Sequence, residues 1–180
     1  IRSLSDVTDQ QRRDAYEAMM STALQGPLET VQFNFLVEGV DRAFTHQMVR
    51  ERHAFFAQES LRFAVKEGFW DEVDLPPSLK GLPDDHPQVT IYKGQLQKAG
   101  EAYEALVADG MPAEEARKLL PHAVTTRLHW VTSLRSLVHV AGLRTCTQAE
   151  FTWRIVMAKV AMALRNHSNG PDRWLSGTEN

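Results

Sequence analysis

Cysteine is almost missing from this sequence, and its scarcity excludes several kinds of site. The single Cys146 among 180 residues excludes an internal disulfide and a metal centre built from several thiolates. One cysteine is typical of a reducing compartment, so we expect a cytoplasmic protein in which Cys146 is a buried structural thiol. Long apolar runs are missing too, because charged residues interrupt them, and we expect no membrane span.

Internal repeats and low-complexity segments are also absent, which excludes solenoid and fibrous architectures. The composition is that of a globular protein, with 43% hydrophobic and 24% charged residues. A chain of this length can bury a core of its own. We therefore expect one domain over residues 1–180.

Positive charge has no overall excess but is concentrated in one region. The net charge of −3 argues against a general nucleic-acid-binding protein. Between residues 117 and 154, however, six basic residues accompany one acidic residue, a local balance of +5. Five of the six are arginines, whose planar guanidinium groups fit phosphate and carboxylate oxygens in pairs. A solvated basic surface is one interpretation of this cluster; a site for a small anionic ligand is the one that the clustering favours.

Hydrophobic spacing predicts a mixture of helices and strands around a small sheet. Helices are expected over residues 7–24, 40–53, 88–108, 133–142 and 147–166, and a short one between Pro112 and Pro121. Thr147 and Glu150 form a predicted capping box for the last long helix. Alternation of apolar and polar residues predicts strands over residues 29–37, ended by Gly39, and over 124–130.

Two connecting segments complete this prediction. Residues 55–65 are expected to be extended, and the proline-rich residues 71–90 to form a loop. A loop of that length is uncommon in a compact domain, so we expect it to be functional or to pack against another subunit.

The most informative segment covers residues 42–63. On a helix, His46, Arg50 and His53 share one face, and in an extended chain Ser60 and Arg62 point to one side. Polar groups on one side, with backbone amides between them and an arginine nearby, can hold a phosphate. A surface helix followed by a polar strand is nearly as compatible with the same residues.

This segment resembles the signature of flavin-dependent thymidylate synthases, in which Arg-His-Arg is followed after seven residues by Ser. Here the corresponding residues are Gln47-x-x-Arg50-Glu51-Arg52 and, seven residues later, Ser60 within Gln58-Glu59-Ser60-x-Arg62-Phe63. Further similarities keep the family's order over about residues 25–157. They are Pro27-Leu28-Glu29, Ala116-Arg117-x-x-Leu120-Pro121, Thr126-Arg127, Leu134-Arg135-Ser136-Leu137, Leu143-Arg144 and Gln148-Ala149-Glu150.

The resemblance implies both a fold and an activity. The expected fold is α+β, with a small, mostly antiparallel sheet and flanking helices. The expected activity is that of a methyltransferase which converts dUMP to dTMP by flavin-dependent methylation of C5. FAD would be the cofactor, and methylenetetrahydrofolate and NADPH the co-substrates. The family also implies a homotetramer with active sites at subunit interfaces.

The resemblance assigns roles to individual residues. The nucleotide is expected to contact Gln47, Arg50, Gln58, Glu59, Ser60, Leu61, Arg62, Arg117 and Arg144. Arg144 is the expected catalytic residue, because a guanidinium against the uracil ring would stabilise negative charge there. FAD is expected to contact Glu29, Arg50, Glu51, Arg52, Ser133, Arg135 and His139. Ser60 is interpreted as a phosphate ligand because no base is evident beside it, and no metal site is expected.

Some positions depart from the family pattern. Glu51 replaces the central histidine of the signature, Ser133 and His139 replace asparagines, and Leu24 replaces a histidine before the flavin-contacting turn. A carboxylate close to FAD phosphates weakens binding unless Glu51 pairs with a neighbouring arginine. Retention of the nucleotide-facing arginines favours a divergent working enzyme over an inactive copy.

The same motifs are compatible with other functions. A methylase acting on UMP for nucleoside antibiotic biosynthesis fits the same motifs, as does a viral or a bacterial thymidylate synthase. A nucleotide-binding module without catalysis is a further alternative. A nucleic-acid adaptor that uses the basic region is the least compatible with the net negative charge.

Overall fold

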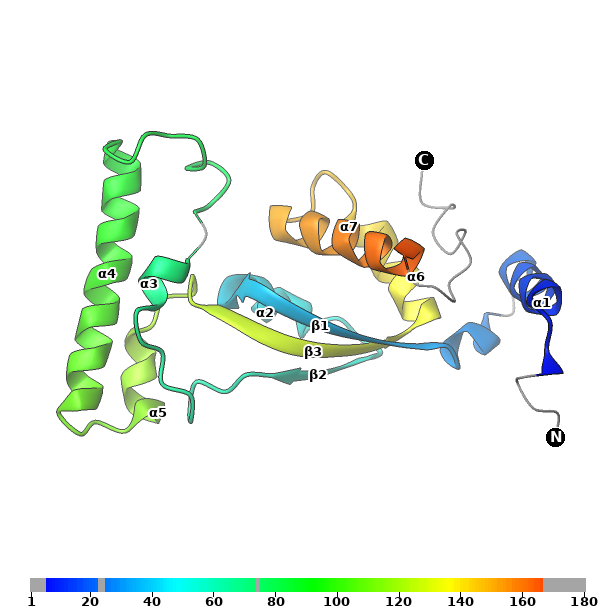
Figure 1. Cartoon of the computed structure of the whole chain (residues 1–180), viewed down its shortest axis with the longest axis horizontal. Coiled ribbons are helices and arrows are strands. Elements are labelled where there is room, and N and C mark those ends of the chain that lie inside the picture. Colours follow the sequence, from blue (N-terminus) through cyan, green and yellow to red (C-terminus); the bar gives the residue numbers. More distant parts are fainter. Residues whose placement is uncertain (1–5, 23–24, 74, 167–180) are drawn as a thin grey trace. The chain divides into compact units, whose positions relative to one another are not determined.

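The structure is a computed structural model, and it describes residues 6–22, 25–73 and 75–166 (Figure 1). The chain forms two compact units: unit 1 from residues 1–35, 51–55 and 130–180, and unit 2 from residues 36–50 and 56–129. Three strands, β1 (Gln32–Asp41), β2 (Ala54–Gln58) and β3 (Thr125–Ser133), form one antiparallel sheet in the order β1-β3-β2. The expected α+β fold is confirmed, whereas a single domain over residues 1–180 stays a prediction.

Strand β1 follows the predicted alternation and then passes the point where it was expected to end. Phe33 and Phe35 are half-buried between exposed neighbours, of which Leu36 is apolar, and Val37 is buried. The prediction that Gly39 ends the strand is wrong, because β1 continues through it to Asp41. Gly39 has a φ of +69°, and the burial pattern shifts by one residue there, so that Val40 is also buried. This is how a glycine bulge lets a strand continue.

Strand β3 contributes the most regular burial pattern of the sheet. Val124, Thr126, Leu128 and Trp130 are all buried, while Arg127 and His129 between them are exposed. A strand with this strict period of two presents one face to the core. The predicted strand over residues 124–130 is therefore confirmed, and it continues to Ser133.

Unit 1 contains α1 (Asp9–Ser21), the 3₁₀ turn η2 (Gly26–Glu29), α6 (Leu134–Arg144) and α7 (Phe151–Asn166). Thr8 caps α1 in a capping box with Gln11. Helix α6 packs against η2 and α7, and Leu137 and Trp153 are completely buried. The predicted helices are present, but α7 begins at Phe151, so Thr147 is not its N-cap. Leu24, and with it the departure predicted there, lies outside the described residues.

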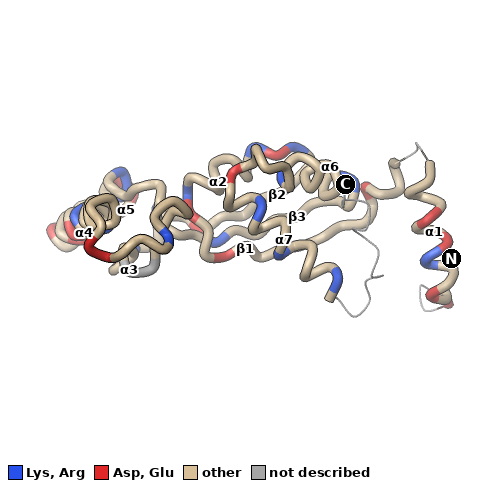
Figure 2. Tube along the Cα trace, turned by 90° about the horizontal axis from the view of Figure 1, so that it is seen from above, with Lys and Arg blue, Asp and Glu red and all other residues tan. Residues whose placement is uncertain are grey.

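Unit 2 contains α2 (Arg42–Met48), α3 (Phe69–Glu72), α4 (Pro87–Ala108), α5 (Ala113–Ala116) and the 3₁₀ turn η3 (Arg117–Leu119). Helix α4 packs against α3, α5 and η3 (Figure 1). Acidic and basic residues both occur in the part of the chain around α4 and α5 (Figure 2), as on a solvated surface. The prediction that residues 71–90 form a loop is partly wrong, because α3 ends inside this range and α4 begins at Pro87.

Two predictions about residues 42–63 are wrong. Helix α2 ends at Met48 and not near His53, which has a φ of +60°, so His46, Arg50 and His53 do not share a helical face. The extended conformation ends at Gln58. Beyond it the chain turns, with the Ser60 hydroxyl accepting a hydrogen bond from the Arg62 N–H at 3.2 Å. Ser60 and Arg62 are therefore not on one side of an extended strand.

Candidate functional site

In unit 1, the turn η2 and the start of α6 lie against each other. The Leu134 N–H donates to the carbonyl of Val31 at 2.8 Å, which fixes the first residue of α6 beside the chain that leaves η2. Arg135 then forms an ion pair with Glu29, with 2.6 Å between Nη1 and Oε1. Both side chains are at least half exposed, so each can also contact a ligand. The structure thus brings together two residues from distant parts of the predicted flavin group.

Helix α6 presents two other residues of that group. Ser133 is its N-cap: the hydroxyl accepts from the Ser136 N–H at 3.2 Å and lies 3.1 Å from the Ser136 hydroxyl. Arg135 and His139 are exposed and four residues apart, so they lie on one face of the helix. An exposed guanidinium and an imidazole on one face fit an anionic cofactor such as FAD. Ser133 fits it less well, because its hydroxyl already serves the cap.

Glu51, the unexpected carboxylate of the signature, is paired with Arg144. Nε of Arg144 donates to Oε1 of Glu51 at 2.9 Å, and Nη2 of Arg144 donates to the same oxygen. The side chains are 12% and 28% exposed for Glu51 and Arg144, so water screens the pair only partly. A carboxylate in this position was expected to be tolerated only beside an arginine, and the structure supplies that arginine.

The other side of the Arg144 guanidinium lies over an aromatic ring. Its carbon Cζ is 4.9 Å from the centroid of the Trp153 ring, and Trp153 is completely buried. A cation over the face of an indole is attracted by the ring's quadrupole. Because the ring and the carboxylate both constrain it, the guanidinium of Arg144 has a defined orientation in unit 1.

In unit 2, Arg62 and Arg117 meet at one residue. Nε of Arg62 lies 2.6 Å from the carboxylate of Glu114, and Nε of Arg117 donates to the main-chain carbonyl of Glu114 at 3.1 Å. The side chains of Arg62 and Glu114 are about half exposed. Two arginines predicted to hold the nucleotide are therefore neighbours, although 55 positions separate them in the sequence.

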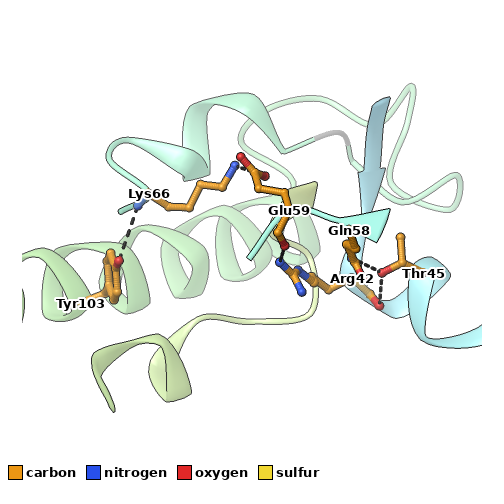
Figure 3. Close-up of polar contacts among 6 residues, drawn as sticks. All are labelled: Arg42, Thr45, Gln58, Glu59, Lys66 and Tyr103. Carbon is orange, nitrogen blue, oxygen red and sulfur yellow. Dashed lines mark hydrogen bonds and ion pairs between the residues drawn. The ribbon is translucent and has the colours of Figure 1, made fainter. Parts of the chain in front are cut away.

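The segment from Gln58 to Arg62 is held from several sides (Figure 3). The Gln58 amide donates to the hydroxyl of Thr45 at 2.9 Å, and the Glu59 carboxylate pairs with Lys66 at 2.9 Å. Leu61 is buried in a cluster with Phe69 and Val124. Leu61 is thus a core anchor, and the polar residues on either side of it are the ones that remain available to a ligand.

The remaining predicted residues lie around the end of α2. Gln47 is on its last turn, and Arg50 and Arg52 follow it; all three are exposed. The roles assigned to these residues stay predictions. Cys146 is exposed, so the prediction of a buried thiol is wrong.

Sequence reasoning missed the partners of the predicted residues: Arg42, Thr45, Lys66, Glu114 and Trp153. Arg42 and Thr45 precede Gln47 on the same helix, and their nearness to the signature is the one signal in the sequence that could have indicated them. No local pattern connects Trp153 with Arg144 or Glu114 with Arg62, because these contacts depend on how distant segments pack.

Comparisons with known proteins identify the family. A family model described as thymidylate synthase complementing protein matches residues 2–167. The chain belongs to this family. This match confirms the family predicted from the motifs, and all of these motifs lie inside the matched range. In the described ranges, no helix is long and apolar enough to cross a membrane.

Curated relatives carry the name flavin-dependent thymidylate synthase. The one from Geobacter sulfurreducens is 36% identical over 160 residues, which cover 89% of this chain and 65% of the relative. The one from Pyrococcus furiosus is 33% identical over 151 residues, which cover 82% of this chain and 61% of the relative. The chain therefore spans slightly less than two thirds of the length of these relatives.

Proposed function

We propose that this protein methylates C5 of a uridine monophosphate nucleotide, converting dUMP to dTMP. Membership of the thymidylate synthase complementing protein family over residues 2–167 carries the proposal. FAD is the proposed cofactor, and methylenetetrahydrofolate and NADPH are the proposed co-substrates. When bound, FAD supplies the hydride and one-carbon chemistry, and the protein binds and orients the reactants.

Arg144 is the proposed catalytic residue. Attack from C5 of uracil requires negative charge to build up on the ring, and a fixed cation beside the ring lowers the energy of that charged state. The guanidinium of Arg144 is held between the Trp153 ring and the Glu51 carboxylate. Such a group does not have to reorganise during the reaction, which is the property that makes a cation effective in catalysis.

The phosphate of the nucleotide has its proposed ligands in unit 2. Arg62 and Arg117 both contact Glu114, and their guanidinium groups carry donors suited to phosphate oxygens. The Arg62 N–H and the Ser60 hydroxyl lie within one turn of chain and can join them. The proposed nucleotide contacts are completed by Gln47, Arg50, Gln58, Glu59 and Leu61.

The FAD contacts are proposed for Glu29, Arg50, Glu51, Arg52, Ser133, Arg135 and His139. Arg135 and His139 fit this role best, because both are exposed on one face of α6. Glu29 and Glu51 each pair with an arginine, so that their carboxylates repel cofactor phosphates less than isolated charges would.

We also propose that the protein is a cytoplasmic homotetramer in which more than one subunit completes each site. Phe55 and Phe63 are large apolar side chains with more than three quarters of their surface exposed, and both lie in the signature segment. Exposed aromatic groups of this size are enriched at protein interfaces.

Release of tritium from C5-labelled dUMP tests the proposal, with labelled UMP assayed in parallel. The wild-type protein, supplied with FAD, NADPH and methylenetetrahydrofolate, is expected to release the label. Arg144→Ala is expected to abolish release while FAD remains bound, and Arg13→Ala, on the exposed face of α1, serves as the matched control. Release of tritium from labelled UMP but not from labelled dUMP would show that the substrate is a ribonucleotide. Release from neither nucleotide would contradict the methylase assignment, and a protein that stays colourless with FAD would favour a binding module.

A further inference from the structure

Arg42, the first residue of α2, lies outside the set assigned to the nucleotide but touches the segment that belongs to it. Its backbone N–H lies 2.9 Å from the carbonyl of His122 and 3.2 Å from that of Val124, which ties the start of α2 to the chain that enters β3. Its guanidinium Nη2 donates to the carbonyl of Glu59 at 2.7 Å (Figure 3). A charged donor therefore connects an anchored helix start to the chain just before Ser60.

Thr45, one turn further along α2, makes a second connection to the same segment. Its hydroxyl accepts from the Gln58 amide at 2.9 Å and lies 3.2 Å from the carbonyl of Arg42. Thr45 is completely buried, so this contact is shielded from water. On the opposite side, the Glu59 N–H donates to the carbonyl of Arg127 at 3.0 Å. The chain entering the Ser60 turn is thus fixed by α2 on one side and by β3 on the other.

The charge around Arg42 is only partly compensated. Its Nε is buried and has no hydrogen-bond partner within the described residues. Burial lowers the pKa of the Arg42 guanidinium, the Glu59 carboxylate raises it, and the nearby Arg117 guanidinium lowers it. The Glu59 carboxylate is already shared with Lys66. Arg42 and Lys66 thus share one carboxylate, and Arg117 adds further positive charge beside Arg42, so a further anion close by is favoured.

We propose that Arg42 is a positioning residue for the nucleotide phosphate. By holding the Glu59 carbonyl it fixes the turn at Ser60–Arg62 in the shape that receives the phosphate, and its charge adds to that of Arg117. The inference rests on the proposed function, because it takes Gln58–Arg62 and Arg117 as nucleotide ligands.

Calorimetry with dUMP and with deoxyuridine, which lacks the phosphate, tests this role. The loss of one hydrogen bond from a charged donor corresponds to a decrease of about tenfold in affinity. Arg42→Met is therefore expected to weaken dUMP binding about tenfold. Binding of deoxyuridine should stay near the wild-type value. In the kinetic assay the KM for dUMP should rise while kcat changes little, and Arg42→Lys, which keeps the charge, should recover part of the affinity.

Arg13→Met, an exposed arginine on α1, is the matched control and should bind dUMP like the wild type. Thr45→Val removes the second connection with almost no change in shape, and a weaker but similar loss of dUMP affinity is expected. If Arg42→Met does not fold, Arg42→Lys and Thr45→Val carry the test. Wild-type affinity in the folded variants, or an equal loss for dUMP and deoxyuridine, would overturn the positioning role. Failure of the wild type to bind either compound would instead overturn the proposed function itself.

Discussion

The Glu51–Arg144 pair leads to a quantitative prediction about stability. Replacing Glu51 by Gln keeps the shape of the side chain but leaves the Arg144 guanidinium without its carboxylate. A hydrogen bond to a charged group contributes about 1.5–3 kcal/mol, whereas an exposed ion pair contributes about 0–1 kcal/mol. The pair is 12% and 28% exposed, so screening is partial and the coupling should lie between these ranges. We expect about 1–2 kcal/mol.

A double-mutant cycle measures this coupling directly. Unfolding in denaturant is followed for the wild type, Glu51→Gln, Arg144→Gln and the double variant, with tryptophan fluorescence as the signal because Trp153 contacts Arg144. Each single variant should be less stable than the wild type, and the double variant should lose less than the sum of the two losses. In a chain of this size, each kcal/mol lowers Tm by about 2–4 °C.

The Glu29–Arg135 pair is the matched control for this cycle. Its side chains are 58% and 50% exposed, so water screens the pair, and its coupling should be about 0–1 kcal/mol and fall with added salt. If Glu51→Gln and Arg144→Gln were additive within about 0.5 kcal/mol, the inference that the carboxylate holds the guanidinium would be refuted.

Further predictions concern packing, titration and the cofactor. In α4, Gly94→Ala should stabilise the protein by about 0.5–1 kcal/mol, because nothing lies within 4 Å of the new Cβ. Gly100→Ala in the same helix should destabilise it by about 1–3 kcal/mol, since its Cβ would overlap the indole of Trp70, and equal denaturation midpoints for the two variants would contradict this packing. Burial, and secondarily Asp41, raises the pKa of Tyr92. The neutral phenol therefore favours the folded state, and its contribution is complete below the unfolded pKa of about 10 and is lost as the pH rises through the folded pKa. Tyr92→Phe should remove part of the alkaline loss of stability in denaturant unfolding, and an unchanged pH profile would argue against the shift. Arg135→Ala should weaken FAD binding in a fluorescence titration with little change in Tm, and unaltered FAD affinity would exclude its proposed contact.

The sequence predicted those elements whose burial repeats regularly along the chain. In β3, Thr126, Leu128 and Trp130 are buried and alternate with more exposed residues. The sequence shows the same two-residue alternation. The long α4 is bounded by Pro87 and by Asp109-Gly110, which are recognisable start and stop signals. The mixture of helices and strands around a small sheet followed from such segments, because each of them is determined mainly by local spacing, whereas the antiparallel α+β class came from the family resemblance.

The sequence did not predict where local preference gives way to packing. Residues 49–53 contain good helix formers, but the helix ends before them, and His53 takes a positive φ where the chain leads into β2. The Ser60 turn depends on a hydroxyl that bonds its own backbone, which competes with an extended strand. At Gly39 the strand continues through a bulge. A glycine in such a segment can equally mark the end of a strand, so the sequence did not distinguish the two outcomes.

For the candidate site, the motifs assigned roles to side chains, which stay predictions, but did not indicate which contacts hold those side chains. The roles predicted for Arg62, Arg117 and Arg144 come from the family resemblance of the motifs in which they lie. The pairing of Glu51 with Arg144 joins residues 93 positions apart, and no periodicity reports on such a contact. The same holds for the exposure of Cys146, because a thiol between two helices can face either way.

Whether this protein methylates the uracil ring is decided by the nucleotide that it leaves behind. Mass spectrometry of the nucleotide pool, after incubation of the protein with dUMP, FAD, methylenetetrahydrofolate and NADPH, measures this directly. We expect a nucleotide heavier than dUMP by one CH₂ unit, with the added carbon on the base, formed by the wild type and not by Arg144→Ala. Recovery of unchanged dUMP from a folded protein with FAD bound would contradict the assignment of C5 methylation.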